Sequence, residues 1–379
     1  MNSPSIEIVN PSGSRRVVVT KPLPGCHWLD VLTAADCRVE IIQGTGILSR
    51  EAVAAGVGPR CDGVIGQLTE SWDAEMFAML ATAGVRVYSN YAVGYNNVDV
   101  AAATALAIPV GNTPGVLTEA TAEHAVALTF AASRRIVEAD RFMREGRFIG
   151  WLPSLFLGQL FHGKTVGIIG AGRIGAAYAK MMVEGHKMDL VYYDLRANLE
   201  LEAYIAAYGT FLTSHGLPAV TCRRLGTVED VLRDADVVSL HTVFDASTHH
   251  LIHAPRLALM KPDAVLINTA RGPLIDEAAL VVHCQANLDF RAGLDVFEDE
   301  PAMKPGLADL PNVVMVPPSP RPPNGPARAW PAWRPATLPP SSKVCRSTKV
   351  ATSAPSSPAK SPRLPPASST PPSWVCRNC

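Results

Sequence analysis

The stretch Thr165-Val-Gly-Ile-Ile-Gly-Ala-Gly-Arg-Ile-Gly175 decides the fold of the chain around it. A β-branched run, Thr165–Ile169, leads directly into a Gly-x-Gly-x-x-Gly pattern, and helix-forming residues follow over Ile174–Val183. The first glycine permits a tight turn, the second allows a ligand to approach the backbone, and the third lets helix and strand pack closely. The pattern predicts a strand, a turn and a helix whose N-terminus presents unpaired N–H groups to phosphates.

By itself the hexapeptide is a weak signal, because a glycine-rich turn also occurs without a ligand. The next apolar run, Asp189–Tyr193, strengthens it, because it ends at Asp194, 19 residues beyond Gly175. A carboxylate here accepts hydrogen bonds from ribose hydroxyls and repels a 2′-phosphate, so the spacing favours NAD(H) over NADP(H). A turn-forming role for Asp194 is the alternative, and Arg196 leaves tolerance of NADP(H) open. The residues expected around the phosphates are Gly170, Gly172, Arg173, Ile174 and Gly175.

Short β-branched runs alternate with helical stretches on both sides of this turn. The expected strands are Arg16–Thr20, Cys37–Gln43, Asp62–Gln67, Val85–Asn90, Ile108–Asn112, Lys164–Ile169, Asp189–Tyr193, Asp236–His241, Ala264–Thr269, Arg291–Phe297 and Asn312–Val316. Val100–Ala107 is an expected helix, and Thr121–Arg147 a long one, with Thr118 and Glu119 near its start as capping candidates. The alternation predicts an α/β protein with two parallel-sheet domains, Rossmann-like or flavodoxin-like, joined by long helices.

Composition narrows the class of protein. The chain has 379 residues, room for two domains, with 34 basic and 34 acidic side chains, which argues against a nucleic-acid-binding protein. No apolar run reaches the ~18–20 residues of a membrane span, and residues 1–21 show no secretory signal pattern. Eight widely spaced cysteines do not form a disulfide framework. We therefore expect a soluble protein of a reducing compartment, cytoplasmic or organellar.

The composition changes sharply after residue 316. Residues 317–379 hold 17 of the 32 prolines and nine Lys and Arg but no Asp or Glu, which makes this tail +9 and residues 1–316 −9. Such a segment buries too little apolar surface to offset its chain entropy, so disorder is expected. The domain expectation is residues 1–117 for substrate, 118–316 for the dinucleotide, and a low-complexity tail over 317–379.

Several motifs together resemble the D-isomer-specific 2-hydroxyacid dehydrogenases, over about residues 15–316. They are Asn90–Asp99 (NYAVGYNNVD), Asn112–Thr121 (NTPGVLTEAT), the glycine turn, Asn268–Pro273 (NTARGP) and Gly293–Pro301 (GLDVFEDEP). Residues 144–164 and 182–188 are most similar to the glycerate dehydrogenases, NADH-dependent hydroxypyruvate reductases, of plants and algae. The resemblance implies an NAD(H)-dependent oxidoreductase that reduces hydroxypyruvate to D-glycerate and glyoxylate to glycolate.

The resemblance also implies roles for particular residues. Arg271 resembles the arginine that holds the substrate carboxylate and polarises its keto oxygen, and Glu300 resembles the carboxylate that orients a catalytic histidine. A surface ion pair is the alternative for Arg271, and a loop-capping or solvated position is the alternative for Glu300. The residues matching the substrate loops are Gln67, Leu68, Val93 and Gly94. The residues matching further cofactor positions are Thr118, for which helix capping is the alternative, His241, Thr269, Ala270 and Asp295.

One family residue is missing from the chain. Members carry a proton-donating histidine in a Pro-His-x-x-Ser motif after the last strand, whereas here Pro318 follows Pro317 and no histidine occurs after His283. A placed histidine contributes roughly 10²–10⁴-fold to catalysis, so impaired turnover is expected.

A frameshift near codon 318 is our hypothesis for the loss. Codons for Ile-Ala-Ser-Ala-Thr, typical after the family's histidine, become codons for Ser319–Pro323 when read one base later. A proline-rich tail kept by selection is the alternative. The nucleotide sequence of gene and transcript across codons 312–325 distinguishes the two.

The partners expected are a 2-keto or 2-hydroxy acid and a second copy of the chain, with no membrane and no nucleic acid. No metal site is expected: His241, His249, His250 and His253 show no ligand spacing, and Cys376-Arg-Asn-Cys379 lacks a second pair. The chain ends without a peroxisomal Ser-Lys-Leu.

A different class of function remains open, a non-catalytic NAD(H)-binding scaffold or redox sensor of the corepressor type. Phosphoglycerate dehydrogenase activity is less favoured, because no extra basic cluster for a phosphate is evident.

Overall fold

The computed structural model describes residues 5–44 and 46–318, which form two α/β units. The first is a six-stranded sheet in the order β1-β3-β2-β4-β5-β6, parallel except for the antiparallel pairing of β1 with β3. Its strands are β1 (Ile6–Val9), β2 (Arg15–Val19), β3 (Cys37–Ile42), β4 (Gly63–Gly66), β5 (Val87–Asn90) and β6 (Val110–Gly111). Its helices are α1 (His27–Ala34), α2 (Arg50–Val57), α3 (Ala74–Thr82) and α4 (Val100–Ala105).

The second unit is a seven-stranded sheet in the order β13-β12-β11-β10-β7-β8-β9, parallel throughout. Its strands are β7 (Thr165–Ile169), β8 (Asp189–Tyr193), β9 (Cys222–Arg224), β10 (Val237–Leu240), β11 (Val265–Asn268), β12 (Arg291–Leu294) and β13 (Val313–Met315). Its helices are α5 (Thr118–Ser133), α6 (Ile136–Arg144), α7 (Arg173–His186), α8 (Leu199–Ser214), α9 (Val228–Asp234), α10 (Ala254–Leu257) and α11 (Glu277–Ala286). Short 3-10 turns lie at Gly272–Leu274 and Leu307–Asp309.

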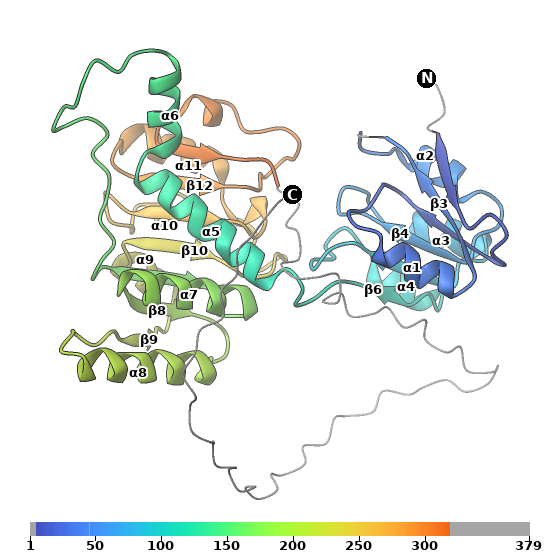
Figure 1. Cartoon of the computed structure of the whole chain (residues 1–379), viewed down its shortest axis with the longest axis horizontal. Helices are drawn as coiled ribbons and strands as arrows, with labels where there is room; N and C mark the ends of the chain where they lie inside the picture. Colours follow the sequence, from blue (N-terminus) through green and yellow to red (C-terminus); the bar gives the residue numbers. More distant parts are fainter. Residues whose placement is uncertain (1–4, 45, 319–379) are drawn as a thin grey trace, which may run out of the picture. The chain divides into compact units, whose positions relative to one another are not determined.

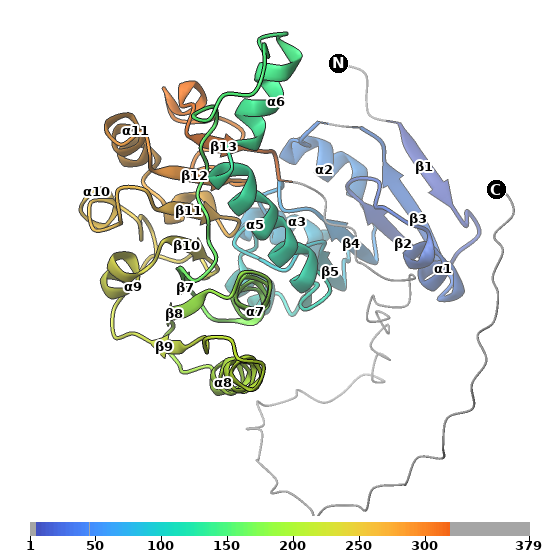
Figure 2. The ribbon, with the colours of Figure 1, turned by 60° about the vertical axis from the view of Figure 1, so that its left-hand side comes forward.

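Helices cover both faces of the seven-stranded sheet. Figure 2 shows α5, α7 and α8 on one side and α9, α10 and α11 on the other. The first face packs residues such as Ile168 and Tyr178, and the second packs residues such as Leu240 and Leu280, all essentially inaccessible to solvent. A sheet covered on both faces explains why its strands read as continuous apolar runs rather than as alternating patterns.

Side-chain caps define where many helices begin. Each capping oxygen accepts a hydrogen bond from a backbone N–H of the first turn, which would otherwise lack a partner inside the helix. The residues that cap in this way are Ser49, Asp73, Asp99, Asn198, Thr227 and Asp276. None of the helices in the described ranges is long and apolar enough to span a membrane.

The predicted α/β class with two parallel-sheet units is confirmed, and every predicted strand is present with small shifts at its ends. Two edge strands, β1 and β9, were not predicted. They are short, Ile6 and Ile8 of β1 are 44% and 43% exposed, and β9 contains two arginines, so neither shows a buried apolar run. The predicted disorder of residues 319–379 lies outside the described residues.

The predicted single helix over Thr121–Arg147 is wrong. The structure has α5 and α6 instead, separated at Arg135, whose backbone is left-handed with φ of 55°. Arg135 donates two hydrogen bonds to Glu138, at 2.8 and 2.6 Å, and its guanidinium lies over the ring of Phe156, 5.1 Å from the centroid. These contacts hold a backbone conformation that no side-chain periodicity reveals.

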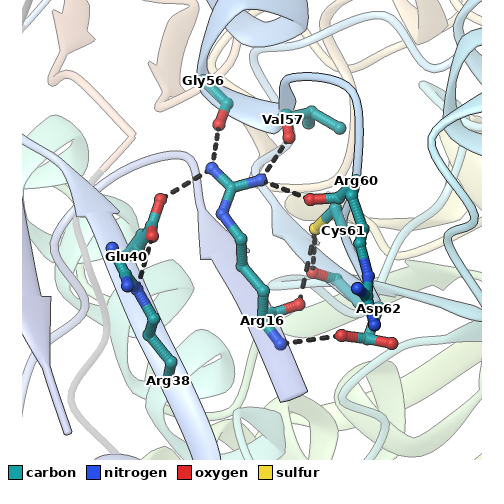
Figure 3. Close-up of polar contacts among 9 residues, drawn as sticks. Arg16, Arg38, Glu40, Gly56, Val57, Arg60, Cys61 and Asp62 are labelled. Carbon is teal, nitrogen blue, oxygen red and sulfur yellow. Dashed lines mark hydrogen bonds and ion pairs between the residues drawn. The ribbon is translucent and has the colours of Figure 1, made fainter. Parts of the chain in front are cut away.

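In the six-stranded unit, a buried carboxylate and an arginine join β2, β3 and α2 (Figure 3). Glu40, with 8% of its side chain exposed, accepts hydrogen bonds from Arg16 at 2.6 Å and Arg38 at 2.8 Å. The Arg16 guanidinium also donates to the carbonyls of Gly56, at 2.8 Å, and Val57, at the C-terminus of α2. The hydrogen bond from Arg16 holds the pKa of Glu40 below its usual value.

Glu40→Gln is expected to destabilise the chain by about 3 kcal/mol at neutral pH, since it leaves a half-buried guanidinium without its counter-charge. Because folding lowers the pKa of Glu40, this contribution is fully present above the unfolded value of about 4.3 and is lost as pH falls through the lower folded value. Urea unfolding of both proteins at pH 7 and pH 3 measures it.

The matched control is Glu75→Gln, which removes an exposed ion pair with Arg50 and should leave the urea midpoint unchanged. An equal gap between parent and Glu40→Gln at both pH values would contradict the prediction.

Candidate functional site

The glycine turn after β7 has the geometry predicted from its sequence. Gly170 has φ of 96°, and a Cβ there would lie 2.7 Å from the backbone of His241. A Cβ on Gly175 would lie 2.1 Å from the carbonyl oxygen of Gly170, so α7 can approach the turn only because residue 175 has no side chain. The space beside Gly172 is open for at least 4 Å. The turn therefore leaves an unfilled cradle at the N-terminus of α7.

The N-terminus of α7 faces a cavity. Gly172 is the N-cap of α7 and supplies no side-chain cap, so the first N–H groups of the helix remain available. The cavity has a volume of about 610 Å³. Its lining includes Gly172, Arg173, Asn198 and Thr118, the last from the first turn of α5. This combination of free N–H groups, a helix dipole and an arginine suits an anion.

Asp194 lies next to the glycine turn. In the parallel pairing of β7 with β8, Ile169 is opposite Tyr193, and the Gly170 amide donates to the carbonyl of Tyr193 at 2.9 Å. The Asp194 carboxylate accepts a hydrogen bond from the amide of Arg196 at 3.1 Å, as in the turn-forming alternative, and Asp194 is half-buried. The local turn bond occupies only one oxygen of the Asp194 carboxylate.

His241 flanks the turn on its other side. Its amide donates to the carbonyl of Ile169 at 2.8 Å, its Nε2 lies 2.9 Å from the hydroxyl of Ser239, and its ring centroid lies 5.3 Å from that of Tyr178. The ends of β8 and β10 therefore bring Asp194 and His241 to opposite sides of one loop.

The next two strands place Thr269 and Asp295 side by side. Asn268 pairs with Leu294, and the Asp295 amide donates to the carbonyl of Asn268 at 3.3 Å. The Thr269 hydroxyl is buried and has no hydrogen-bond partner among the described residues, and Ala270 follows it, half-buried. A buried hydroxyl without a protein partner is expected where a ligand completes the site.

Sequence reasoning missed a contact of Asp295. Its carboxylate is 2% exposed, and its Oδ2 lies 3.3 Å from Nε2 of His124 on α5. The available signal was weak: His124 lies four residues before Leu128 on the same helix, a spacing that places both on the face toward β12.

Arg271 is close to one of the predicted substrate loops. A Cβ on Gly94 would come within 1.6 Å of Nη2 of Arg271, so the absence of a side chain at Gly94 makes room for the guanidinium. Arg271 also donates through Nε to the side chain of Asn96 at 3.3 Å. The side chain of Asn90 donates to the carbonyl of Gly94 at 2.8 Å and holds the loop that contains Val93. Asn96 was not predicted, although it lies within a quoted motif.

The second predicted substrate loop is attached to the first. Asn97 donates to the carbonyl oxygens of Gln67, at 2.9 Å, and Glu70, at 3.1 Å. Leu68 is 47% exposed, whereas Nε2 of Gln67 is buried without a partner in the described part of the chain. Burial raises the pKa of Glu70, which accepts a hydrogen bond from the Gln67 amide at 2.5 Å.

Glu300 occupies an exposed loop position. It accepts a hydrogen bond from the amide of Phe297 at 2.9 Å, which is the loop-capping alternative. The carboxylate of this loop that contacts a histidine is Glu298, whose Oε1 lies 2.8 Å from Nε2 of His250. Pro318 is exposed after β13.

Two expectations about single residues need correction. Thr118 does not cap α5: the N-cap is Leu117, and the helix start has no side-chain cap. Thr118 lines the cavity at α7 instead, and its expected contact with the cofactor stays a prediction. The histidines without ligand spacing in the sequence also come together in part, because His249, His250 and Glu298 form a cluster.

Gly175→Ala is expected to weaken NADH binding at least about tenfold. The new methyl group must push α7 away from the carbonyl of Gly170, at a cost of about 1–3 kcal/mol, and the helix N-terminus moves with it. Fluorescence titration with NADH measures the affinity.

The control is Gly185→Ala on the same helix, where the space is open for 4 Å and alanine favours the helix. Equal affinities of the two variants would show that the close approach of α7 does not shape the site.

Comparisons with known proteins identify the family to which the chain belongs. The sequence profile described as D-isomer specific 2-hydroxyacid dehydrogenase, NAD binding domain, matches residues 126–318. Glycerate dehydrogenase of Cucumis sativus is 59% identical over 313 residues, covering 82% of each chain. The protein named glycerate dehydrogenase HPR, peroxisomal, of Arabidopsis thaliana is 58% identical over 314 residues, covering 83% of this chain and 81% of its own.

Among solved structures, the TT0316 protein of Thermus thermophilus superposes with a TM-score of 0.69 at 37% identity, covering 80% of this chain and 89% of that one. Profile, relatives and fold all point to the same family. The chain therefore belongs to the D-isomer-specific 2-hydroxyacid dehydrogenases, which are NAD-dependent oxidoreductases acting on CH–OH groups.

Proposed function

We propose that the chain binds NADH together with a small 2-keto acid, with hydroxypyruvate reduced to D-glycerate and glyoxylate reduced to glycolate. The names of the Cucumis and Arabidopsis relatives support the first substrate, and a 42% identical glyoxylate reductase of Korarchaeum cryptofilum supports the second. The observation that carries the proposal is the close approach of the Arg271 guanidinium, from the end of β11, to the loop at Gly94.

The residues present fit a dinucleotide. The cradle beside Gly172 and the free N–H groups of α7 would hold its phosphates, Asp194 and His241 would flank its adenosine end, and the buried hydroxyl of Thr269 would gain a partner. Ala270 would supply backbone beside Thr269, and Asp295 would accept from the carboxamide of the nicotinamide. When bound, NADH supplies the hydride for the substrate carbonyl.

Arg271 would hold the substrate carboxylate. Its planar fork suits two-point binding of a carboxylate, and its permanent charge polarises the neighbouring keto oxygen. The backbone N–H groups of Val93 and Gly94 would bind the same carboxylate, while Gln67 and Leu68 would contact the other side of the substrate. The hydrogen bonds that link these loops through Asn90 and Asn97 preorganise them for this task.

The proton for the developing alkoxide has no evident donor at the position where the family carries one. Glu300 is present, but Pro318 stands where the resemblance places a histidine. Without that imidazole, the rate is expected to fall roughly 10²–10⁴-fold. Binding of both ligands would persist, because none of the residues assigned to it lies beyond β13.

We retain the proposed domain division at residues 117 and 316. The first part carries the substrate loops, the second carries the cofactor residues, and α5 begins directly after the first boundary at Thr118.

The second candidate function is a non-catalytic NAD(H)-binding scaffold or redox sensor. Pro318 is the observation that favours it, since a chain without the proton donor could still bind the dinucleotide and change conformation with it. NADH binding without measurable turnover of any 2-keto acid supports this candidate over the enzyme.

We also propose that the chain forms a homodimer through residues 145–164. This segment stands off the seven-stranded sheet between α6 and β7 (Figure 1). It exposes several large apolar side chains: Ile149 is 90%, Trp151 82%, Leu160 70% and Leu157 66% exposed. A concentration of exposed apolar surface of this kind indicates a protein interface.

Pro318→His is expected to raise the turnover number for hydroxypyruvate at least about tenfold, because it places an imidazole at the position of the missing proton donor. NADH oxidation followed at saturating substrate measures it, with Pro318→Ala as the control for the loss of proline alone. If Pro318→Ala raised turnover as much, or if the parent already matched Pro318→His, a different group would supply the proton.

Trp151→Asp is expected to convert the dimer to a monomer, since a charge would be buried in the proposed apolar interface. Light scattering coupled to size-exclusion chromatography measures the mass. Leu288→Asp, at a side chain that is 65% exposed outside the segment, should remain dimeric. A monomeric parent would refute the proposed dimer.

A further inference from the structure

Two adjacent histidines in the loop after β10 lie close to a glutamate in the loop after β12. His249 and His250 follow β10, and Glu298 follows β12. One ligand atom from each side chain lies within 4.8 Å of the other two. Two imidazole nitrogens and one carboxylate oxygen are a ligand set that Zn²⁺ and other first-row transition-metal ions prefer.

Hydrogen bonds hold His250 in place. Its backbone is left-handed with φ of 48°, an uncommon conformation for a residue other than glycine, and its amide donates to the carbonyl of Pro273 at 2.8 Å. The amide of Ile252 donates to the carbonyl of Leu274 at 2.9 Å. The two histidine rings stack with centroids 4.0 Å apart. The histidine pair is thus fixed against the segment that follows Arg271.

Hydrogen bonds hold Glu298 at its backbone amide and at its carboxylate. Its amide donates to the carboxylate of Glu277 at 2.7 Å, and its Oε2 accepts from the amide of Glu277 at 3.3 Å. Its other oxygen, Oε1, lies 2.8 Å from Nε2 of His250. Oε1 is therefore the oxygen that faces the imidazoles, so the carboxylate presents a defined ligand atom rather than a solvated surface charge.

The charged side chains around the cluster would admit a cation, but Lys304 would compete with it for the Glu298 carboxylate. Lys304 lies 3.7 Å from Oε1 of Glu298, but its shorter ion pair is with Asp299, at 2.7 Å. Asp299 and Glu298 together supply two negative charges against the single charge of Lys304. A divalent cation would therefore enter a site of net negative charge, and removal of Lys304 should favour it.

The geometry points to a divalent transition-metal site formed by His249, His250 and Glu298, which we propose as a new binding site of this chain. The tetrahedral bond lengths of Zn²⁺, about 2.0–2.1 Å, require the His250–Glu298 pair to open slightly and the exposed ring of His249 to turn inward. The ion would replace the hydrogen bond between Nε2 of His250 and Oε1 of Glu298, since a ring nitrogen that binds a metal carries no proton. Solvent would complete the coordination.

The site would couple two loops of the candidate active site. The histidine pair is bonded to Pro273, two residues after Arg271, and Glu298 lies two residues before Glu300. A bound ion would tie these loops together, whether or not the chain turns over a substrate. The inference is therefore independent of the proposed reductase activity.

The test is titration of the full chain with Co²⁺, followed by its visible absorption, and with Zn²⁺ in competition against a chromophoric chelator. His249→Phe keeps the aromatic stacking on His250 but removes a ligand atom, and it should weaken binding about 10–100-fold. Lys304→Met should tighten binding about tenfold. His215→Phe, at an exposed histidine just after α8, should bind as the parent does.

Cys376 and Cys379 lie outside the described residues and are present in every variant, so binding is scored as the difference from the parent. A loss of one equivalent of bound Co²⁺ in His249→Phe, with unchanged circular dichroism, supports the site. Equal binding by parent and His249→Phe, or a binding loss shared by His215→Phe, would overturn it.

Discussion

The close approach of α7 to the turn after β7 is the constraint on which the rest of the site depends. It exists because Gly175 lacks a Cβ that would otherwise meet the Gly170 carbonyl at 2.1 Å. β7 lies between β8 and β10 in the sheet, so Asp194 and His241, at the ends of these two strands, lie on either side of the turn. The parallel register then continues through β11 and β12, whose ends carry Thr269 and Asp295. The glycine at residue 175 thus lets α7 approach the turn, and the parallel register arranges the polar side chains on either side of it.

The central strands could be predicted from the sequence because burial on both faces leaves a continuous apolar run, as in Val265–Asn268. Two of the edge strands, β1 and β9, could not be predicted, since they are short and largely exposed. The break between α5 and α6 could not be predicted from the sequence for another reason. It depends on the left-handed backbone of Arg135 and on its contacts with Glu138 and Phe156, residues whose spatial relation exists only in the folded chain.

The candidate site was predictable to the level of strand ends. The rule that ligands bind outside the carboxyl ends of parallel strands placed Arg271 and Asp295 at neighbouring strand ends, where the structure also has them. The rule does not give the direction of a side chain, so it did not show that Asp295 contacts His124 or that Glu298 contacts His250. The roles of Gln67 and Val93 came from the resemblance alone. The contacts of Asp295 with His124 and of Glu298 with His250 depend on distances between segments that are remote in the chain.

Gly272 has a consequence for protein engineering. A Cβ on this buried residue would lie 1.9 Å from the backbone of Phe297, so the segment after Arg271 and the segment that carries Glu298 and Glu300 touch backbone to backbone. No side chain lies between them to absorb an adjustment. A library that remodels substrate preference by varying only one of these segments will meet steric conflict with the other. Combinatorial designs should therefore diversify both segments together and leave Gly272 untouched.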